Sequence, residues 1–373
     1  MIITIISHTP HYEHGGKIYG WGPTVKEVNF LSSLFSKVNH IAPIYESFPP
    51  KSAELYNSSK VNFISIKPRG GRGIKNKIDI IKGIPFQLLL INKYCKDSDW
   101  IQFRAPTNMG MYVLPYLRFF NKTKYWVKYA GDWGIKNPPI SYLIQRFWLK
   151  KNYNQSFVTI NGKWENQENH LISLENPCLT IEEIVRAKSV IINKNYSGKL
   201  ILCFVGLISK AKGLGLFLSS LEKIIKNDFI KIVYVVGDGP KSKKYQKRAK
   251  LILNINIRFT GSLNRDELNK IYEKAHIIVL PSYSEGFPKV IAEASAYGCV
   301  PIVSNVGSIG QYINESNGVL LKNNSIDDVY RAITFLNNNR SLLKKISKEC
   351  NKISKKFSFI RYNSLISKII LKK

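Results

Sequence analysis

Two glutamates, Glu285 and Glu293, lie around the start of one short predicted helix in the stretch SEGFPKVIAEASAYG (284–298). A helix N-terminus favours negative charge, because its first amides have no partner inside the helix and its dipole is positive there. The two carboxylates can therefore simply complement the dipole. Alternatively, they can frame an anionic ligand that binds the same free amides.

The elements around the two glutamates favour a ligand site. A buried strand is expected over HIIVLPS (276–282), and YSEGF forms the turn beyond its carboxyl end. Gly286 lets the backbone approach a ligand, Pro288 suits the first helical turn, and Gly298 is a suitable helix end. The free amides at the helix start form a ready pyrophosphate site. We expect the ligand-binding segment to comprise Gly286, Phe287, Pro288, Lys289 and Val290.

The spacing of the two glutamates indicates the kind of ligand. At 1.5 Å per helical residue they are separated by about 10 Å along the axis, which is about the span of a diphosphate. One carboxylate can then accept hydrogen bonds from hydroxyls on one side of the phosphates, and the other from hydroxyls on the opposite side. A sugar joined through pyrophosphate to a ribose has this layout.

The segment PSYSEGFPKVIAEASAYGCVPIVSNVGSIGQYI (281–313) resembles the carboxyl-terminal signature of the retaining family-4 type glycosyltransferases, glycosyl transferases group 1, which have the GT-B fold. In that family the first glutamate of E-x7-E holds the donor sugar and the second holds the ribose. The resemblance assigns these roles to Glu285 and Glu293. It continues through FVGLISKAKG (204–213), VVGDGP (235–240) and FTGSL (259–263).

The segment 204–213 also departs from the family pattern. Relatives usually read Gly-Arg-Leu, then three residues, then Lys-Gly, and the Arg and Lys neutralise the donor diphosphate. Here Lys212 and Gly213 match, but Leu207 stands where the Arg is expected. Lys210 can reach in instead, although it lacks the bidentate geometry of arginine. Further donor-side contacts are expected at Gly206, Lys210, Gly237 and Gly239.

The first half offers fewer candidates. Gly15 and Gly16 follow the first predicted strand, where relatives often carry a Gly-Gly pair facing the donor phosphates and the acceptor. Asp132 follows a strand end at which many relatives carry a histidine, and we take it as the candidate for an acceptor-side contact or base. Arg104, at another strand end, is positioned to meet an acceptor phosphate.

Metal-binding patterns are weak. The spacing of His8, His11 and His14 is not a helical i, i+4 pair, and no cysteine accompanies them. Asp97 and Asp99 form a D-x-D, which another glycosyltransferase class uses for a metal. They precede a predicted strand, however, so they lie at its wrong end for a ligand site. We expect no metal and no cofactor, since the nucleotide-sugar is a substrate.

The order of elements predicts an α/β fold. Short apolar runs alternate with helical segments twice, which indicates two doubly wound Rossmann-like domains facing a central cleft, the GT-B architecture. We expect an N-terminal acceptor-side domain over 1–180, a connection over 181–198 and a C-terminal donor domain over 199–355. A last helix over 356–373 can cross back to the first domain.

Composition limits the class of partner. The chain has 373 residues and a net charge of +31, which predicts an anionic partner or simply reflects a lysine-rich composition. Basic stretches such as KPRGGRGIKNK (67–77) lie in the first half. The five scattered cysteines indicate buried, reduced thiols in a cytoplasmic protein, and no run is long enough to span a bilayer.

These observations predict a retaining, metal-independent transferase. It would move a sugar from a nucleotide-sugar to a glycan or polyprenyl-diphosphate-linked acceptor in bacterial surface polysaccharide (O-antigen or capsule) synthesis. We expect a cytoplasmic location, peripheral on the anionic inner face of the cell membrane. A nucleotide-sugar epimerase of the same fold remains an alternative. A basic nucleic-acid-binding protein is another, although no nucleic-acid motif is visible and we expect no such partner.

Overall fold

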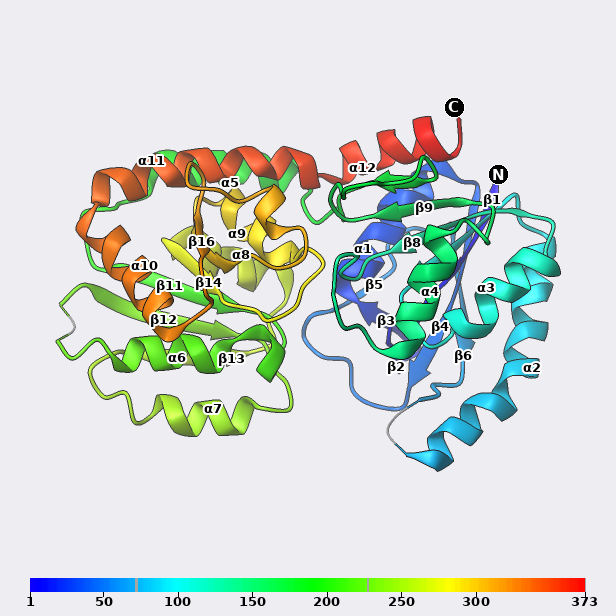
Figure 1. The fold of residues 1–373 in the computed structure, drawn as a ribbon, viewed down its shortest axis with the longest axis horizontal. Helices are drawn as coiled ribbons and strands as arrows, with labels where there is room; N and C mark the ends of the chain where they lie inside the picture. Colours follow the sequence, from blue (N-terminus) through cyan, green and yellow to red (C-terminus); the bar gives the residue numbers. More distant parts are fainter. Residues whose placement is uncertain (71–72, 227, 373) are drawn as a thin grey trace. The chain divides into compact units, whose positions relative to one another are not determined.

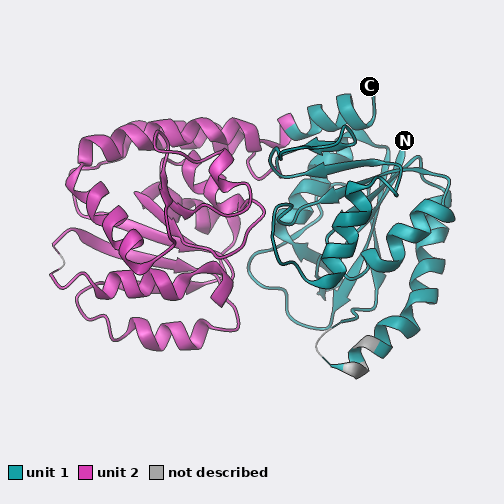
Figure 2. Cartoon of the chain, viewed as in Figure 1, with its two compact units in different colours: residues 1–175, 362–373 teal, residues 176–361 magenta. Residues whose placement is uncertain are grey.

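The computed structural model describes residues 1–70, 73–226 and 228–372. The chain divides into two compact units, of which unit 1 comprises residues 1–175 and 362–373 and unit 2 comprises residues 176–361 (Figure 2). Gly71 and Arg72, in the basic stretch 67–77, lie outside the described residues. No helix in the described ranges has both the length and the apolarity needed to cross a membrane.

Unit 1 is built on one large, mostly parallel sheet (Figure 1). The strand order is β10-β9-β8-β7-β1-β4-β2-β3-β5, and β6 also pairs with β4. The central strands are buried on both faces, which explains their nearly continuous apolar sequences. The strands are β1 (Ile2–Ile6), β2 (His11–His14), β3 (Lys17–Trp21), β4 (Lys37–Tyr45), β5 (Ala53–Leu55), β6 (Val61–Ile66), β7 (Trp100–Ala105), β8 (Lys124–Tyr129), β9 (Phe157–Ile160) and β10 (Leu171–Ser173).

The helices of unit 1 connect these strands. They are α1 (Gly22–Leu31), α2 (Ile74–Lys96), α3 (Gly110–Phe119) and α4 (Ile140–Lys150). The apolar runs at 2–7, 40–45, 61–66, 100–105, 125–130 and 156–161 predict β1, β4, β6, β7, β8 and β9. They do not include the antiparallel hairpin of β2 and β3, whose strands mix polar, aromatic and aliphatic residues and are only partly buried.

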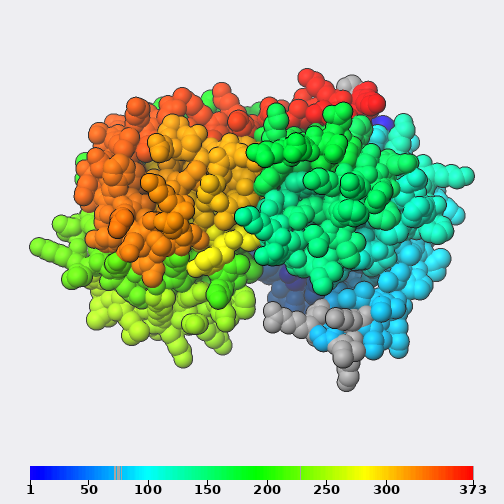
Figure 3. Space-filling view, viewed as in Figure 1, coloured from blue at the N-terminus to red at the C-terminus, as the bar shows by residue number. Residues whose placement is uncertain are grey.

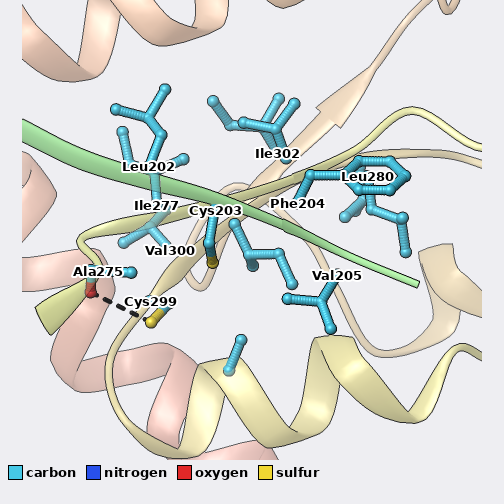
Figure 4. Packing of buried hydrophobic residues seen from close by; sticks show 14 of the residues in the cluster. Leu202, Cys203, Phe204, Val205, Ala275, Ile277, Leu280, Cys299, Val300 and Ile302 are labelled. Atoms are coloured by element: carbon cyan, nitrogen blue, oxygen red, sulfur yellow. Dashed lines mark hydrogen bonds between the residues drawn. The ribbon is translucent and has the colours of Figure 1, made fainter. Parts of the chain in front are cut away.

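Unit 2 contains a six-stranded parallel sheet in the order β13-β12-β11-β14-β15-β16. Its strands are β11 (Leu200–Val205), β12 (Ile230–Val236), β13 (Ile257–Gly261), β14 (Ile277–Leu280), β15 (Val300–Ser304) and β16 (Val319–Leu321). Figure 4 shows the apolar side chains of β11, β14 and β15 packed together, with the Cys299 thiol 3.1 Å from the carbonyl oxygen of Ala275. The five cysteines are all buried and unpaired.

The helices of unit 2 are α5 (Ile181–Asn193), α6 (Leu214–Glu222), α7 (Ser242–Ala249), α8 (Arg265–Lys274), α9 (Lys289–Ala296), α10 (Ile326–Asn338) and α11 (Arg340–Cys350), with a short 3-10 helix η2 (Lys210–Lys212). Helix α12 (Phe359–Leu365) carries the chain from unit 2 into unit 1.

The unit boundaries differ from the segment limits expected from the sequence. Residues 181–193 form helix α5 inside unit 2, where the sequence suggested a connection. A reciprocal pair of hydrogen bonds between Thr180 and Glu183 caps this helix, and such a capping box explains why the helix begins there. The last residues cluster with unit 1, where Tyr362, Ile366 and Ile370 are buried against Ile3 and Trp126.

Candidate active site

Unit 2 has a topological switch point between β11 and β14. From β11 the chain proceeds to β12 and β13 on one side of the sheet, and then to β14, β15 and β16 on the other. Ligands of doubly wound sheets bind outside the carboxyl ends of the strands at such a point. Helix η2 with Lys212 follows β11, and the turn with Glu285 follows β14, so both predicted donor residues lie at the switch point.

Lys212 and Glu285 contact each other there. The Lys212 ammonium donates a hydrogen bond to Oε1 of Glu285, and the Ser282 hydroxyl donates to the same oxygen over 3.0 Å. The Glu285 side chain is only 9% exposed, whereas that of Lys212 is 25% exposed. The site therefore contains a positive and a negative group in direct contact at the carboxyl edge of the sheet.

Glycines allow the surrounding loops to pack this closely. A Cβ on Gly213, which has a φ of 77°, would lie 1.9 Å from the carbonyl oxygen of Pro281. A Cβ on Gly307 would lie 1.9 Å from the carbonyl oxygen of Glu285. The amide of Tyr283 also donates to the carbonyl of Ala211 over 2.8 Å. The loops that carry Lys212 and Glu285 are thus fixed to one another through their backbones.

The other predicted donor-side glycines have a similar structural role. A Cβ on Gly237 would lie 2.0 Å from the carbonyl oxygen of Gly206, and one on Gly239 would lie 2.6 Å from that of Ile208. Asp238 accepts hydrogen bonds from the Ser242 hydroxyl and the Gly239 amide, and these bonds lower the pKa of its carboxyl. The loops after β11 and β12 are therefore close-packed, and this packing alone requires glycine at 237 and 239.

Helix α9 begins directly after the turn that carries Glu285. Pro288 is its N-cap and Lys289 its first residue, so Pro288 lies just before the helix rather than within its first turn. Phe287 stacks on Phe357 with ring centroids 4.4 Å apart, and Val290 packs against the core. The side chains of these two predicted contacts point into the protein, and only their backbone groups are left for a ligand.

Glu293 is buried in an ionic cluster. Its Oε1 lies 2.7 Å from Nη1 of Arg265, and its Oε2 accepts a hydrogen bond from the Tyr272 hydroxyl over 3.3 Å. Nε of Arg265 also donates to Glu183 over 2.6 Å. Burial alone would lower the pKa of Arg265, but Glu293 and Glu183 raise it well above its usual value. The structure thus gives Glu293 partners that the sequence did not reveal.

The two remaining residues of the diphosphate region are on the surface. Lys210 is exposed in η2, and Leu207, at the position of the family arginine, is 56% exposed. An apolar side chain therefore faces solvent beside the site, and Lys210 is the nearby exposed cation in the same loop.

In unit 1, Gly15 and Gly16 form the tip of the hairpin between β2 and β3, with φ values of 58° and 69°. Positive φ at both central residues is the requirement of a type I′ turn, so this turn itself requires the glycines. Asp132 lies after β8, and its Oδ1 accepts a hydrogen bond from the Gly134 amide over 3.0 Å. The carboxylate of Asp132 thus supports a local turn in addition to any role with an acceptor.

Arg104 has an internal counter-ion that the sequence did not reveal. Its Nη1 lies 2.8 Å from Oε1 of Glu27, which is buried in α1 and also accepts from the Lys128 ammonium. The Tyr362 hydroxyl donates to the same Glu27 oxygen over 3.2 Å. Arg104 therefore belongs to a buried network that fixes the C-terminal residues to unit 1, with Glu27 as its counter-ion.

His11 and Asp99, from the two metal-like patterns, have structural partners. Nε2 of His11 lies 2.7 Å from the Tyr56 hydroxyl, and burial lowers the pKa of His11 to about 4. Asp99 accepts from the amide of Ile2 at the amino end of the sheet, over 2.6 Å. Within the described ranges, no group of three or more His, Cys, Asp or Glu side chains is arranged to hold a metal ion.

A pocket of about 620 Å³ lies at the carboxyl ends of β1, β4, β6 and β7 in unit 1. The tyrosines Tyr45, Tyr112 and Tyr142 line it, together with Lys67 and Arg69. Arg69 also donates to Asp79 of α2. The remaining lining residues are His8, Pro43, Ile66, Pro68, Gly70, Ile80, Gln87, Thr107, Asn108 and Met109. The sequence alone does not reveal this pocket, because residues of three helices join the loops after the strands only in the folded chain.

Comparisons with known proteins agree with this geometry. The family model described as Glycosyl transferases group 1 matches residues 185–354. The chain is 31% identical over 160 residues to the uncharacterized glycosyltransferase MJ1178 of Methanocaldococcus jannaschii, across 42% of this chain and 43% of that protein. It is 30% identical over 149 residues to the UDP-Gal:alpha-D-GlcNAc-diphosphoundecaprenol alpha-1,3-galactosyltransferase of Escherichia coli, across 39% and 38%. The chain spans less than half the length of these curated relatives.

Solved structures match over the whole chain. Sucrose-phosphate synthase from Thermosynechococcus elongatus has a TM-score of 0.75 at 15% identity, across 100% of this chain and 98% of that chain. Anabaena HepE in complex with UDP-glucose has a TM-score of 0.68 at 12% identity, with full coverage of both chains. The fold is thus the GT-B fold predicted from the sequence. The region that matches the glycosyl transferases group 1 model, residues 185–354, lies within unit 2.

Proposed function

We propose that this protein transfers a sugar from a nucleotide-sugar to an acceptor hydroxyl. The observation that carries the proposal is the contact of Lys212 with Glu285 at the switch point of unit 2, next to the N-terminus of α9. A diphosphate needs positive charge and amide donors, and a sugar needs an acceptor for its hydroxyl protons. Lys212, the first amides of α9 and Glu285 supply these groups within one small region.

The donor binds as follows in this proposal. The diphosphate lies against the α9 amides and takes the Lys212 ammonium as its counter-ion, while the Glu285 carboxylate accepts hydrogen bonds from the sugar. Glu293 accepts from the ribose. Its present bonds to Arg265 and Tyr272 then orient the carboxylate and hold its charge in a buried position. The HepE structure, which contains UDP-glucose, supports a donor of this class.

The transfer retains the anomeric configuration and needs no metal ion. The bond from the anomeric carbon to the donor phosphate breaks with oxocarbenium-like character, and the departing diphosphate is stabilised by Lys212 and the helix amides. The acceptor oxygen attacks from the same face, and the leaving phosphate helps to take its proton. Asp132 is the acceptor-side candidate in unit 1.

The acceptor is a glycan or a polyprenyl-diphosphate-linked sugar. The pocket of unit 1 supports this choice, because its tyrosines suit sugar rings and its Lys67 and Arg69 suit phosphate. The E. coli relative bears a name that specifies a diphosphoundecaprenol acceptor. We therefore propose a role in bacterial surface polysaccharide synthesis, with the protein at the cytoplasmic face of the membrane.

A donor screen tests the function. UDP-, GDP- and ADP-sugars are added separately, and thermal unfolding is followed. One of these nucleotide-sugars should raise the melting temperature. With that donor labelled in the sugar, the label should appear in a glycan acceptor with retained configuration. A changed free nucleotide-sugar would indicate an epimerase. Tight, salt-dependent binding to DNA or RNA, with no donor protection, would indicate a nucleic-acid-binding protein.

A further inference from the structure

Helix α4 exposes its apolar side. Ile140, Leu143, Ile144 and Phe147 are between 44% and 77% exposed, and their spacing of i, i+3, i+4 and i+7 places them on one side of the helix. A surface helix normally buries such a stripe and exposes its polar residues. In α4 this stripe is exposed instead, while Gln145 and Leu149 are the buried residues of the helix.

The end of α3 extends this surface. Phe119 and Phe120 are 65% and 77% exposed, and the Phe119 ring lies edge-on to Trp148 of α4, with centroids 6.2 Å apart. Helices α3 and α4 also pack against each other. We call the surface formed by Phe119, Phe120, Ile140, Leu143, Ile144 and Phe147 the apolar face. Residues 140–150, coloured green, lie on the near surface of unit 1 in Figure 3.

Positive charge lies beside the apolar face. Lys150 and Lys151 follow Phe147 and are exposed, and the Arg118 guanidinium lies 5.6 Å from the centre of the Phe119 ring. Helices α3 and α4 contain no acidic residue. In the sequence, Asp132 is the only acidic residue from 100 to 164, a stretch with ten lysines and arginines.

We propose that the apolar face inserts into the interface of an anionic phospholipid bilayer, with the surrounding lysines and arginines on the headgroups. Exposed aromatic and aliphatic side chains beside cations are what interfacial membrane binding requires. The charge favours a bilayer over a second copy of the chain. A symmetric dimer through this face would bring two cationic rims together, and like charges across an interface oppose association.

The pocket of unit 1 lies against the same helices, so docking would have a functional consequence. The use of docking is to bring this pocket to the membrane. Tyr112 of α3 and Tyr142 of α4 line the pocket of unit 1. The buried Gln145 donates to the carbonyl of Thr107, another lining residue, over 2.9 Å. The helices that carry the apolar face therefore also form the pocket, so docking would hold the pocket at the headgroup level. Only this use rests on the proposed function, because docking itself needs neither donor nor acceptor.

Vesicle sedimentation tests the proposal. The full-length protein is mixed with phosphatidylcholine vesicles that contain 0 to 40% phosphatidylglycerol, about the range over which surface charge changes strongly, across a salt series. We expect binding that rises with anionic lipid and weakens as salt rises. The double variant Ile144→Ser/Phe147→Ser should bind at least about tenfold more weakly at every salt concentration, since its loss is apolar.

Two further variants sharpen the test. Lys150→Gln/Lys151→Gln should lose binding at low salt and resemble the unchanged protein at high salt, where charges are screened. The matched control Leu251→Ser/Leu253→Ser removes two apolar residues that are 79% and 92% exposed in unit 2, and it should bind vesicles normally. All variants should keep the same affinity for nucleoside diphosphate.

The outcomes separate this proposal from the proposed function. Unchanged vesicle binding by Ile144→Ser/Phe147→Ser, or no binding by the unchanged protein at low salt, overturns the docking proposal and leaves sugar transfer untouched. If the unchanged protein self-associates but does not bind vesicles, and Ile144→Ser/Phe147→Ser abolishes the self-association, then the apolar face binds a second copy of the chain. This result also overturns the docking proposal. If no nucleotide-sugar binds, the proposed transferase function is contradicted. The vesicle experiment still tests the docking proposal in that case, because it needs no donor.

Discussion

Replacing Lys212 with methionine should weaken nucleoside diphosphate binding strongly. Methionine keeps an unbranched side chain of similar length but removes the ammonium that contacts Glu285. A hydrogen bond to a charged group contributes about 1.5–3 kcal/mol, and about 1.4 kcal/mol corresponds to a tenfold change in affinity. The Lys212→Met variant should therefore bind nucleoside diphosphate about 10- to 150-fold more weakly.

Replacing Glu285 with glutamine should have the opposite effect on binding. In the structure the Lys212 ammonium is already engaged by Glu285, so an incoming diphosphate must compete with this carboxylate. Glutamine removes the competing charge while keeping the shape. We expect the Glu285→Gln variant to bind nucleoside diphosphate as tightly as the unchanged protein or more tightly, and to turn over about 10- to 150-fold more slowly, because it loses a charged acceptor for the sugar.

Titration calorimetry with the nucleoside diphosphate and initial rates with the matching nucleotide-sugar check both expectations. Lys243→Met is the matched control, because Lys243 is an exposed lysine of α7 outside the proposed site. Two results would refute the reasoning. One is normal diphosphate affinity in Lys212→Met. The other is a loss of affinity in Glu285→Gln as large as that in Lys212→Met, since both residues would then act as a structural pair.

The remaining predictions concern the ribose contact, stability and metal. Glu293→Gln should weaken nucleotide binding by about 1.5–3 kcal/mol in calorimetry, whereas equal affinity would assign Glu293 to structure alone. Arg265→Met should lower the free energy of unfolding in urea by about 3–5 kcal/mol, because it removes the cation that Glu183 and Glu293 share. A smaller loss of stability than in Glu293→Gln would contradict the role of Arg265 in this cluster. Burial lowers the pKa of His11 and of His276 to about 4, so the folded state favours their neutral forms. The free energy of unfolding should therefore be highest above pH 6.5 and fall as the pH drops toward 4, by up to about 3 kcal/mol per histidine. A melting temperature that stays constant between pH 6.5 and pH 4 would contradict this prediction. Transferase activity should persist in EDTA. A loss of activity that manganese or magnesium restores would contradict a metal-independent reaction.

Much of the fold could be predicted because its signals are local. Buried parallel strands appear as apolar runs, and six such runs in the first half match β1, β4 and β6 to β9. The hairpin of β2 and β3 could not be predicted in this way, since its strands form no continuous apolar run and are held by pairing with β4 and β5. Helix α5 has a start signal in the sequence itself, because Thr180 and Glu183, three residues apart, form a capping box, but its weak apolar periodicity favoured a connection.

For the candidate site, the sequence alone determined which chemistry is available: a strand, a glycine-containing turn and a helix start with Glu285, and a lysine in a second loop at residue 212. These are local patterns, in which neighbouring residues decide the conformation. Only the tertiary structure decided the partners of these groups. Sheet order places the end of β11 beside that of β14 and so joins Lys212 to Glu285, 73 positions apart. Long-range packing likewise pairs Glu293 with Arg265 and Arg104 with Glu27. A buried charge is stable only beside a counter-ion, and the tertiary fold decides which residue supplies it.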